Sequence, residues 1–267
     1  MIDIRHISFS YPHYDIVEKE GKPVLKDISL HVSEGMRILI IAPPDSGKTT
    51  LAKILIRGIP TYGGGELKGS ITLGNKNLLA LESYDVMDSI TYIGQNPQEQ
   101  LLMNTCGDEI SFPLEALGLE KGEIASRISS SLDKWGLKEH IEVHPQELSG
   151  GERKRLLLAV SESIGAKLWV LDEIFDDLDN LYKSKLINTL KTRGGCSITF
   201  ASRFLPEFVD YVLIAKKYAK DKSISKLERI RSGHLSSFLK PKRDLSSETT
   251  YSQAEELLSR VISGYES

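Results

Sequence analysis

Two patterns of hydrophobic positions divide the chain into strand-like and helix-like segments. Apolar and polar residues alternate along 2–9 and 25–32, as on strands with one buried face. Short apolar runs are typical of strands buried on both faces, and they occupy 37–42, 167–173, 196–202 and 211–215. Strand-like segments also occupy 70–73 and 89–94. Helical patterns occupy 48–58, about 105–140 and 148–165.

The order of these segments predicts the fold class. Strands that alternate with helices are typical of an α/β fold with a mainly parallel core sheet. A helical stretch at about 96–147 is expected to form an insert in this core. With 267 residues, the chain is long enough for one large domain with appendages.

Composition narrows the classes of function. Hydrophobic residues make up 40% and charged residues 27% of the chain, as in ordinary globular proteins. The formal net charge of -3 provides no overall positive field to attract nucleic acid or anionic lipid. The N-terminal sequence lacks a signal-peptide pattern, and no apolar run reaches the length of a membrane span. We therefore expect any role at a membrane to depend on a partner protein.

The C-terminal part of the chain differs from the rest. Residues 216–231 are basic and weakly patterned, as in a solvated hairpin, and 241–250 are polar and linker-like. Ser252 and Glu255 form a capping-box pattern that predicts the start of a helix. The apolar face of this helix consists of Ala254, Leu257, Leu258, Val261 and Ile262. Two interpretations stay open, because the face could pack on its own domain or be covered by another subunit.

The stretch IAPPDSGKTT (41–50) contains the second half of the phosphate-binding pattern G-x-x-x-x-G-K-[ST]. Ala42 replaces the first glycine, at a cost of roughly 1–2 kcal/mol if this position requires a left-handed backbone. Lys48 is expected to reach the β- and γ-phosphates, and the Thr49 hydroxyl is expected to bind Mg²⁺. The residues expected around the phosphates are Pro44, Asp45, Ser46, Gly47, Lys48, Thr49 and Thr50.

Four further stretches carry groups suited to nucleotide chemistry, each with a simpler alternative. Asp172 and Glu173 end a buried strand, where carboxylates can hold Mg²⁺ and activate water, although such a pair is often a solvated turn. LSGGE (148–152) places two glycines at a helix start, which suits an anion site or a plain N-cap. Gln95 follows a strand and could contact a metal or lie at the surface. Tyr11 could stack on a purine or belong to the core.

In this order and spacing, the motifs resemble those of the ATP-binding-cassette (ABC) ATPases over about residues 1–215. The stretches GQNPQEQL (94–101) and DEISFPLEALGL (108–119) are similar to those of cobalt-type and energy-coupling-factor ATPases, which power bacterial vitamin and metal uptake. The resemblance implies a P-loop ABC domain at 1–215 with an antiparallel β part near the N-terminus. It also implies a C-terminal extension at 216–267 that carries a dimerising helix.

The resemblance implies roles for residues in the chain's own half-site. Tyr11 would stack on the adenine of ATP. Thr49, Gln95 and Asp172 would hold Mg²⁺, and Gln95 would also link the site to the helical insert that grips a membrane subunit. Glu173 would act as the general base.

In this family two ABC domains pair head to tail, so that the signature LSGGE of one chain completes the site of the other. The resemblance therefore implies that Ser149, Gly150 and Gly151 contact the γ-phosphate held by a partner chain. Asp179, in the stretch IFDDLD, matches the loop that crosses between the two sites.

Three positions depart from the family pattern. The first is Ala42, and the second is Ile174, which replaces the usual proline after the acidic pair. The third is the pair Ser202 and Arg203, which stands where the family has threonine and a histidine that orients the attacking water. Arg203 occupies a catalytic position and can attract γ-phosphate charge, but an arginine cannot accept a proton. We therefore expect ATP binding with slow or absent hydrolysis, in the degenerate A-prime-type member of a heterodimer.

The resemblance implies an ATPase that energises vitamin or metal uptake from the cytoplasmic face of the cell membrane. Its expected partners are a second ABC ATPase, an integral-membrane scaffold and a substrate-binding membrane subunit, without nucleic acid. Two other classes stay open. One is a soluble ABC ATPase of translation or DNA maintenance, and the other is a regulatory ABC subunit that does not hydrolyse ATP.

Overall fold

The computed structural model describes residues 1–12, 23–42, 44–204, 211–217, 224–231 and 249–250. The chain divides into two compact units. Unit 1 comprises Met1–Leu81 and Cys196–Ser267, and unit 2 comprises Glu82–Gly195.

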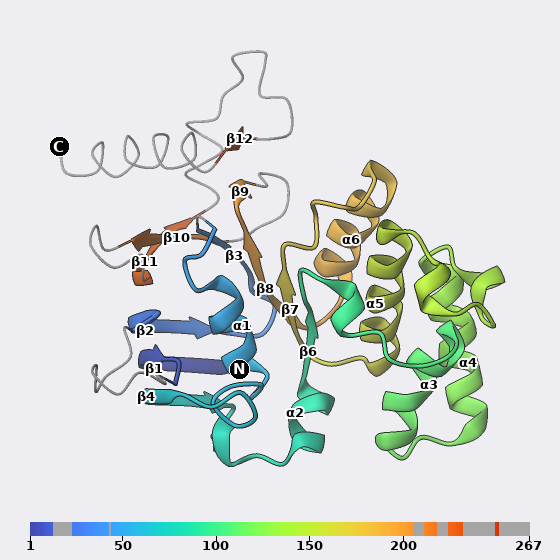
Figure 1. The fold of residues 1–267 in the computed structure, drawn as a ribbon, viewed down its shortest axis with the longest axis horizontal. Helices are drawn as coiled ribbons and strands as arrows, with labels where there is room; N and C mark the ends of the chain where they lie inside the picture. The colour runs from blue at the N-terminus through green and yellow to red at the C-terminus, as the bar shows by residue number, and fades with distance from the viewer. Residues whose placement is uncertain (13–22, 43, 205–210, 218–223, 232–248, 251–267) are drawn as a thin grey trace. The chain divides into compact units, whose positions relative to one another are not determined.

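Unit 1 contains a mixed β-sheet and helix α1 (Lys48–Leu55), as Figure 1 shows. Its strands are β1 (Ile2–Ser10), β2 (Leu25–Val32), β3 (Arg37–Ile41), β4 (Glu66–Leu73), β5 (Lys76–Asn77), β8 (Cys196–Ala201), β10 (Tyr211–Lys217) and β11 (Ile224–Arg231). They follow the order β5-β4-β1-β2-β11-β10-β3-β8. β1 pairs antiparallel with β2 and β4, whereas β3 pairs parallel with β8 and β10. The antiparallel N-terminal part and the parallel core implied by the resemblance are thus both present.

Burial in these strands follows the sequence pattern. In β2, buried and more exposed positions alternate from Ile28 to Val32, so one face of the strand packs on the core. β3 is buried from Ile38 to Ile41, because it is paired along both edges and covered on its faces. A small second sheet in unit 1 pairs β9 (Arg203–Phe204) with β12 (Thr249–Thr250).

Unit 2 combines two parallel strands with helices (Figure 1). Its elements are α2 (Ser83–Ser89), β6 (Ile90–Ile93), α3 (Cys106–Ala116), α4 (Lys121–Lys134), α5 (Gly150–Ile164), β7 (Leu168–Asp172) and α6 (Asn180–Thr192), with short 3-10 helices at Pro97–Glu99, Lys138–His140 and Pro145–Glu147. β6 pairs with β7 in parallel. α3, α4 and α5 pack against one another, with Leu114, Leu132 and Leu156 buried.

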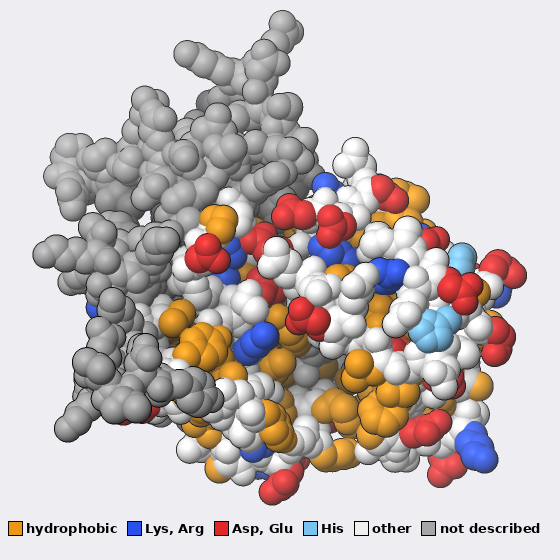
Figure 2. Space-filling model, in the orientation of Figure 1, with side chains coloured by type: hydrophobic (Ala, Val, Ile, Leu, Met, Phe, Trp, Pro, Cys, Tyr) orange, Lys and Arg blue, Asp and Glu red, His pale blue; other side chains and the backbone are white. Residues whose placement is uncertain are grey.

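Unit 2 also exposes large hydrophobic side chains. Leu102 is 75% exposed, Phe112 on α3 is 58% exposed and Ile141 is 39% exposed. Figure 2, in the orientation of Figure 1, shows hydrophobic side chains gathered over α3. Across the described part of the chain, no helix has both the length and the hydrophobicity needed to cross a bilayer.

The helical patterns at 105–140 and 148–165 are confirmed by α3, α4 and α5, and every predicted strand is present. Some boundaries differ. The strand predicted at 70–73 begins at Glu66, and the helix predicted over 48–58 ends at Leu55. β5 was not predicted, because two exposed residues carry no periodic pattern and form a strand only by pairing with β4.

The predicted basic hairpin contains β11, which pairs antiparallel with β10. β11 also lies beside β2 in the sheet of unit 1, with Ile224 opposite Leu25. The sheet thus includes residues beyond the predicted domain boundary at 215, and the division into domains stays a prediction. The amphipathic helix predicted from Ser252 lies outside the described residues.

Candidate functional site

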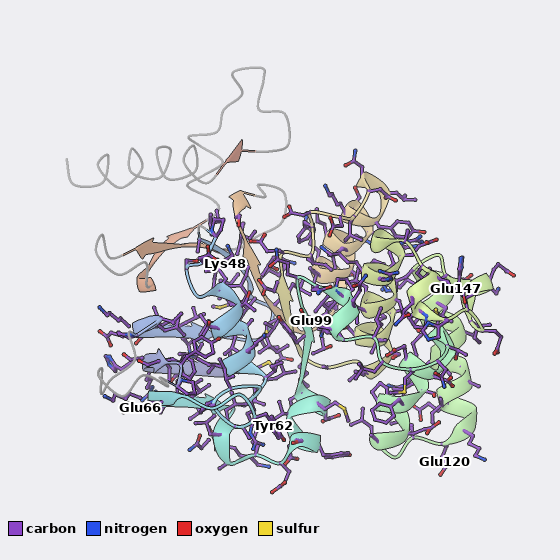
Figure 3. The ribbon with its side chains drawn as sticks, viewed as in Figure 1. Lys48, Tyr62, Glu66, Glu99, Glu120 and Glu147 are labelled. Atoms are coloured by element: carbon purple, nitrogen blue, oxygen red, sulfur yellow. The ribbon has the colours of Figure 1, made fainter. Side chains whose placement is uncertain are left out.

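The predicted phosphate-binding loop lies in unit 1, between the end of β3 and the start of α1 (Figure 3). Ile41 ends β3 opposite Ala201 of β8 and Ile214 of β10. The loop therefore leaves the carboxyl edge of three parallel strands, where ligands commonly bind in α/β proteins. α1 begins at Lys48, so its first N–H groups and the positive end of its dipole face this loop.

Left-handed backbone in the loop occurs at Asp45, with a φ of 57°, and at Gly47, with a φ of 95°. A Cβ at Gly47 would lie 2.9 Å from Val24 Cγ1, so both conformation and space require glycine there. Ala42 is not among the described residues with positive φ, and its N–H donates to the Ala201 carbonyl at 3.1 Å. The loss of glycine at position 42 therefore carries no left-handed strain in this structure.

The Lys48 side chain folds back over the loop. Its Nζ donates to the Ala42 carbonyl oxygen at 2.7 Å and to Ser202 Oγ at 2.9 Å. Lys48 is only 7% exposed, and a buried ammonium group requires nearby acceptors. Phosphate oxygens are strong acceptors for such a group, so the position of Lys48 suits an anionic ligand. Ser202, part of the third departure from the family pattern, thus contacts the lysine of the phosphate loop.

Hydroxyl groups complete the surroundings of the loop. Ser46 is 1% exposed, and its Oγ has no hydrogen-bond partner among the described residues. Such a group is costly unless a ligand or water satisfies it, so the loop fits a phosphate-bearing ligand. The Tyr11 hydroxyl lies 3.0 Å from Thr50 Oγ1, and its ring meets that of Phe9 edge-on. Tyr11 therefore lies beside the start of α1, and it is 42% exposed.

The predicted carboxylates lie at the end of β7 in unit 2. Asp172 is fully buried, and Glu173 is 8% exposed with a φ of 52°. Burial raises the pKa of Tyr92 on β6, and the charge of Asp172 and a hydrogen bond to it raise this pKa further. The Tyr92 phenol therefore stays protonated and donates to the Asp172 carboxylate. A left-handed backbone costs a non-glycine residue roughly 1–2 kcal/mol, so the surroundings of Glu173 must hold it in place.

Gln95 lies just after β6, and its side chain is exposed. The preceding main chain is clamped by Gln100, whose Oε1 accepts from Gly94 N at 2.6 Å and whose Nε2 donates to the Tyr92 carbonyl at 3.0 Å. Asn96 Oδ1 also accepts from Gln98 N at 3.2 Å and caps the following 3-10 helix. The main chain around Gln95 is thus fixed while its amide stays accessible.

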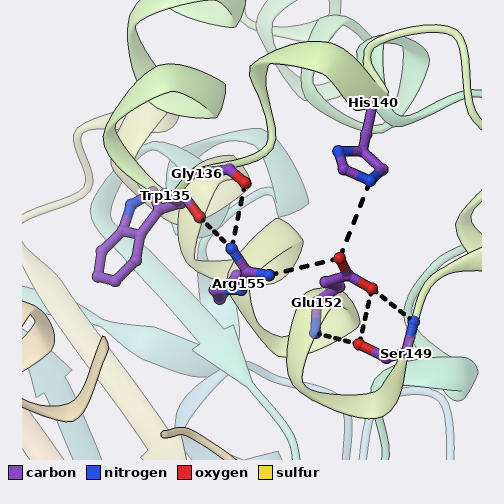
Figure 4. A network of polar contacts seen from close by, with 6 residues as sticks. All are labelled: Trp135, Gly136, His140, Ser149, Glu152 and Arg155. Atoms are coloured by element: carbon purple, nitrogen blue, oxygen red, sulfur yellow. Dashed lines mark hydrogen bonds and ion pairs between the residues drawn. The ribbon is translucent and has the colours of Figure 1, made fainter. Parts of the chain in front are cut away.

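The signature LSGGE starts α5 in unit 2, and Figure 4 shows its polar network. Ser149 and Glu152 form a capping box: Ser149 Oγ accepts from Glu152 N at 3.3 Å, and Glu152 Oε2 accepts from Ser149 N at 2.9 Å. Hydrogen bonds from Ser149 hold the pKa of Glu152 below its usual value. Arg155 pairs with Glu152 at 3.5 Å and donates to the Trp135 carbonyl at 2.9 Å. The N-cap interpretation is therefore confirmed, and it leaves the anion role open.

The predicted site residues are thus divided between the two units. Unit 1 brings together Tyr11 and the phosphate-loop residues, and unit 2 contains Gln95, the carboxylates and the signature. Arg203 lies at the start of β9, and its side chain is outside the described residues. The catalytic and binding roles of all these residues stay predictions.

Sequence reasoning did not assign roles to Gln100, Tyr92 and Lys154. In the structure, these side chains bond to predicted site residues of unit 2 or to the main chain beside them. Gln100 belongs to the quoted GQNPQEQL stretch, so its motif was a usable signal. Tyr92 and Lys154 carry no such signal, because their roles depend on partners 80 and 19 residues away along the chain, Asp172 and Glu173.

Within the described residues, no cluster of three or more His, Cys, Asp and Glu side chains could hold a metal ion. Mg²⁺ at nucleotide sites needs no such cluster, because it binds one or two protein groups, substrate phosphates and water. The hydroxyl, amide and carboxylate oxygens of Thr49, Gln95 and Asp172 are ligand types that suit Mg²⁺.

The sequence matches known ATP-binding proteins. The family described as ABC transporter matches residues 25–176, which is more than half of the chain. A protein of Pyrococcus horikoshii named as an ABC transporter ATP-binding protein is 34% identical over 221 residues, 81% of this chain and 80% of that protein. The energy-coupling factor transporter ATP-binding protein EcfA of Methanothermobacter thermautotrophicus is 29% identical over 221 residues, 80% of this chain and 67% of that protein. Some relatives are longer, and the chain spans 29% of one from Methanosarcina acetivorans that is 28% identical over 191 residues.

Two solved structures share the fold. The structure of cbiO1 from Clostridium perfringens, described as part of the ABC transporter complex cbiONQ, has a TM-score of 0.67 at 21% identity, covering 88% of this chain and 90% of cbiO1. A dimeric ATP-binding cassette in a post-hydrolysis state, bound to ADP and Pi, has a TM-score of 0.71 at 20% identity, covering 86% and 99% of the two chains. The fold is thus that of an ATP-binding cassette, and from the family match this chain belongs to the ABC transporter family and contains its ATP-binding domain.

Proposed function

We propose that this chain is the ATP-binding subunit of an energy-coupling-factor type importer that takes up a vitamin or a metal ion. The EcfA relative and the GQNPQEQL stretch (94–101) support this subgroup. The chain would act at the cytoplasmic face of the membrane together with a second ABC ATPase, an integral-membrane scaffold and a substrate-binding membrane subunit.

The geometry of the phosphate loop is the observation that supports ATP binding by this chain. Lys48 is buried with its ammonium group bonded to the Ala42 carbonyl of the loop, and the same loop contains the buried Ser46 hydroxyl, which has no hydrogen-bond partner among the described residues. ATP phosphates would replace the Ala42 carbonyl and Ser202 Oγ as hydrogen-bond acceptors of Lys48 Nζ. They would also accept hydrogen bonds from the N–H groups in the first turn of α1. The loop therefore supplies both positive charge and hydrogen-bond donors to an anionic ligand.

Hydrolysis would depend on Glu173, whose carboxylate would accept a proton from the attacking water. Mg²⁺, when bound, would neutralise charge on the β- and γ-phosphate oxygens. Asp172 would face this ion, and its carboxylate would accept a hydrogen bond from the Tyr92 phenol. Arg203 stands where the family has its orienting histidine and cannot accept a hydrogen bond, so turnover in this half-site would be slow.

The signature would act in the opposite half-site of a head-to-tail heterodimer. Ser149, Gly150 and Gly151 lie at the N-terminus of a 15-residue helix, which suits the approach of a γ-phosphate. The dimeric cassette bound to ADP and Pi supports an assembly of two such domains. A chain with a slow site of its own and an intact signature would still complete an active site on its partner.

The exposed hydrophobic side chains of unit 2 support docking on a membrane subunit. Leu102, Phe112 and Ile141 belong to the helical insert that, by resemblance, grips the scaffold. Monomeric proteins rarely leave a large apolar patch uncovered unless it binds something.

ATP binding and hydrolysis by the purified full-length chain test the proposal. We expect calorimetry to detect ATP binding that Lys48→Ala abolishes, while steady-state turnover by the chain alone is negligible. Addition of the second ABC ATPase and the scaffold should produce turnover. Rapid hydrolysis by the isolated chain would contradict the impaired half-site, and absence of ATP binding would contradict the function itself.

A further inference from the structure

Lys154 is a buried cation on α5, and the proposed mechanism assigns no role to it. It is 1% exposed, although lysine is rarely buried without partners. Its Nζ donates to the Glu173 carbonyl oxygen at 3.1 Å and pairs with Asp177 Oδ2 at 2.7 Å. Both acceptors belong to the segment that follows β7, and this segment contains the proposed catalytic base.

The start of α5 touches the same segment at a second point. A Cβ at Gly151 would lie 3.2 Å from the Asp177 carbonyl oxygen, so the two main chains approach closely. Gly151 and Lys154 are three residues apart and therefore lie on one face of the helix. The signature helix thus contacts the Glu173–Asp177 segment both through main chain and through a buried ammonium group.

The main chain of Glu173 needs such support because its φ of 52° is unfavourable for a residue with a side chain. Hydrogen bonds from charged donors are about twice as strong as neutral ones. The Asp177 side chain is 62% exposed, so water solvates this carboxylate and weakens its share of the interaction. The bond from Lys154 to the Glu173 carbonyl lies in the buried part of the structure and carries most of the restraint.

We propose that Lys154 is a positioning residue, whose ammonium group holds the left-handed main chain of Glu173 and thereby the direction of the Glu173 carboxylate. The same lysine ties the base of this chain's own half-site to the helix that presents the signature to the opposite one. The importance of this restraint for hydrolysis rests on the proposed role of Glu173, but the restraint itself does not. Loss of Lys154 should therefore lower turnover and leave ATP affinity nearly unchanged.

Amide hydrogen exchange in the full-length chain tests the restraint without any nucleotide. In Lys154→Met, we expect exchange of the amides at 173–179 to become about tenfold to a hundredfold faster, from the loss of a charge-assisted hydrogen bond. Arg153→Met is the matched control, because Arg153 is the next residue along the chain and donates to the carbonyls of Pro145 and Gln146 instead. It should leave exchange at 173–179 unchanged, and Lys154→Arg should recover part of the protection.

Two further measurements decide the remaining outcomes. Asp177→Asn removes only the exposed partner and should fold, with exchange at 173–179 about threefold faster. In the assembled complex with the partner's own site silenced, Lys154→Met should lower kcat at least about tenfold while the ATP dissociation constant changes less than about threefold.

Unchanged exchange in both Lys154→Met and Asp177→Asn, or an equal rise throughout unit 2, would overturn the proposal. If Lys154→Met does not fold, unchanged exchange in Asp177→Asn overturns it. Failure of the wild-type chain to bind ATP would instead refute the proposed function and leave the exchange result valid.

Discussion

The phosphate loop and the signature both place glycine at the start of a helix, but for different physical reasons. Gly47 has a φ of 95°, and a Cβ there would lie 2.9 Å from Val24 Cγ1. Gly150 has no positive φ, and a Cβ there would meet nothing within 4 Å. The start of α5 is determined instead by the capping box of Ser149 and Glu152.

This difference separates folding from function in the two motifs. Gly47 is needed by the chain itself, because its backbone conformation and surroundings exclude a side chain. At Gly150 the chain alone provides room for a side chain, so a requirement for glycine there would come from a ligand or a partner. The signature is therefore the better place to test the proposed head-to-tail assembly, and the phosphate loop the better place to test binding within one chain.

The largest expected effect comes from Ser149→Arg, which places a bulky cation where the partner's γ-phosphate would approach. ATPase activity and transport by the assembled complex should fall by about a hundredfold or more, as when a group that binds transition-state charge is lost. Ser149→Thr is the control, because it keeps a capping hydroxyl. Glu173→Gln, which removes the proposed base of the half-site that we expect to be slower, should cost much less. A greater loss from Glu173→Gln would show that this chain's own site is the working one.

Arg203→His tests the proposal that this chain's own half-site is slow. If the missing histidine limits hydrolysis, restoring it should raise turnover about tenfold or more, within the roughly 10²–10⁴-fold range of acid–base and orienting groups. The measurement requires the complex with the partner's own site inactivated, and Arg203→Lys serves as a control that keeps the charge. The absence of any gain in Arg203→His would remove the histidine from the explanation.

Gly47→Ala should damage the phosphate loop in the isolated chain. A side chain in this left-handed conformation costs roughly 1–2 kcal/mol before the contact with Val24 is counted, so the free energy of unfolding should fall by at least that amount. ATP affinity should fall as well, because the loop has to shift to relieve the contact with Val24. Calorimetry with ATP and thermal unfolding of the same variant measure the two consequences. Wild-type affinity and stability together would show that the loop tolerates a different backbone.

Gly150→Ala should have the smallest effect on the isolated chain. The free energy of unfolding should stay within about 1 kcal/mol of the wild type or rise, because alanine favours a helix more than glycine does. ATP affinity of the isolated chain should not change, whereas ATPase activity of the complex should fall. Loss of ATP binding by the isolated variant would place Gly150 in this chain's own site and contradict the proposed pairing.

Much of the site was predictable because local patterns carry it. The phosphate loop was identified from Gly47, Lys48 and Thr49, and the structure gives Gly47 the left-handed conformation that only glycine adopts easily. Ser149 and Glu152 have the spacing of a capping box, which needs only residues within one helical turn. The capping box depends only on residues within one helical turn, so the local sequence contains its determinants. The space at Gly47 also depends on Val24, which lies far away along the chain.

Long-range packing decided the rest. β11 has weak periodicity and forms a strand because it pairs with β10 and lies beside β2. In the sequence, Lys154 is one of several basic residues on a predicted helix. Only in the structure does the Glu173–Asp177 segment lie close enough to bury it and to accept its hydrogen bond and ion pair. Ala42 looked like a defect in the loop, but whether a position requires a left-handed backbone depends on the path of the chain in space. By itself the sequence determined the motifs, the α/β alternation and most strands and helices, since these follow from local periodicity. The tertiary structure alone decided which buried groups hold the Glu173–Asp177 segment, since those contacts join residues far apart along the chain.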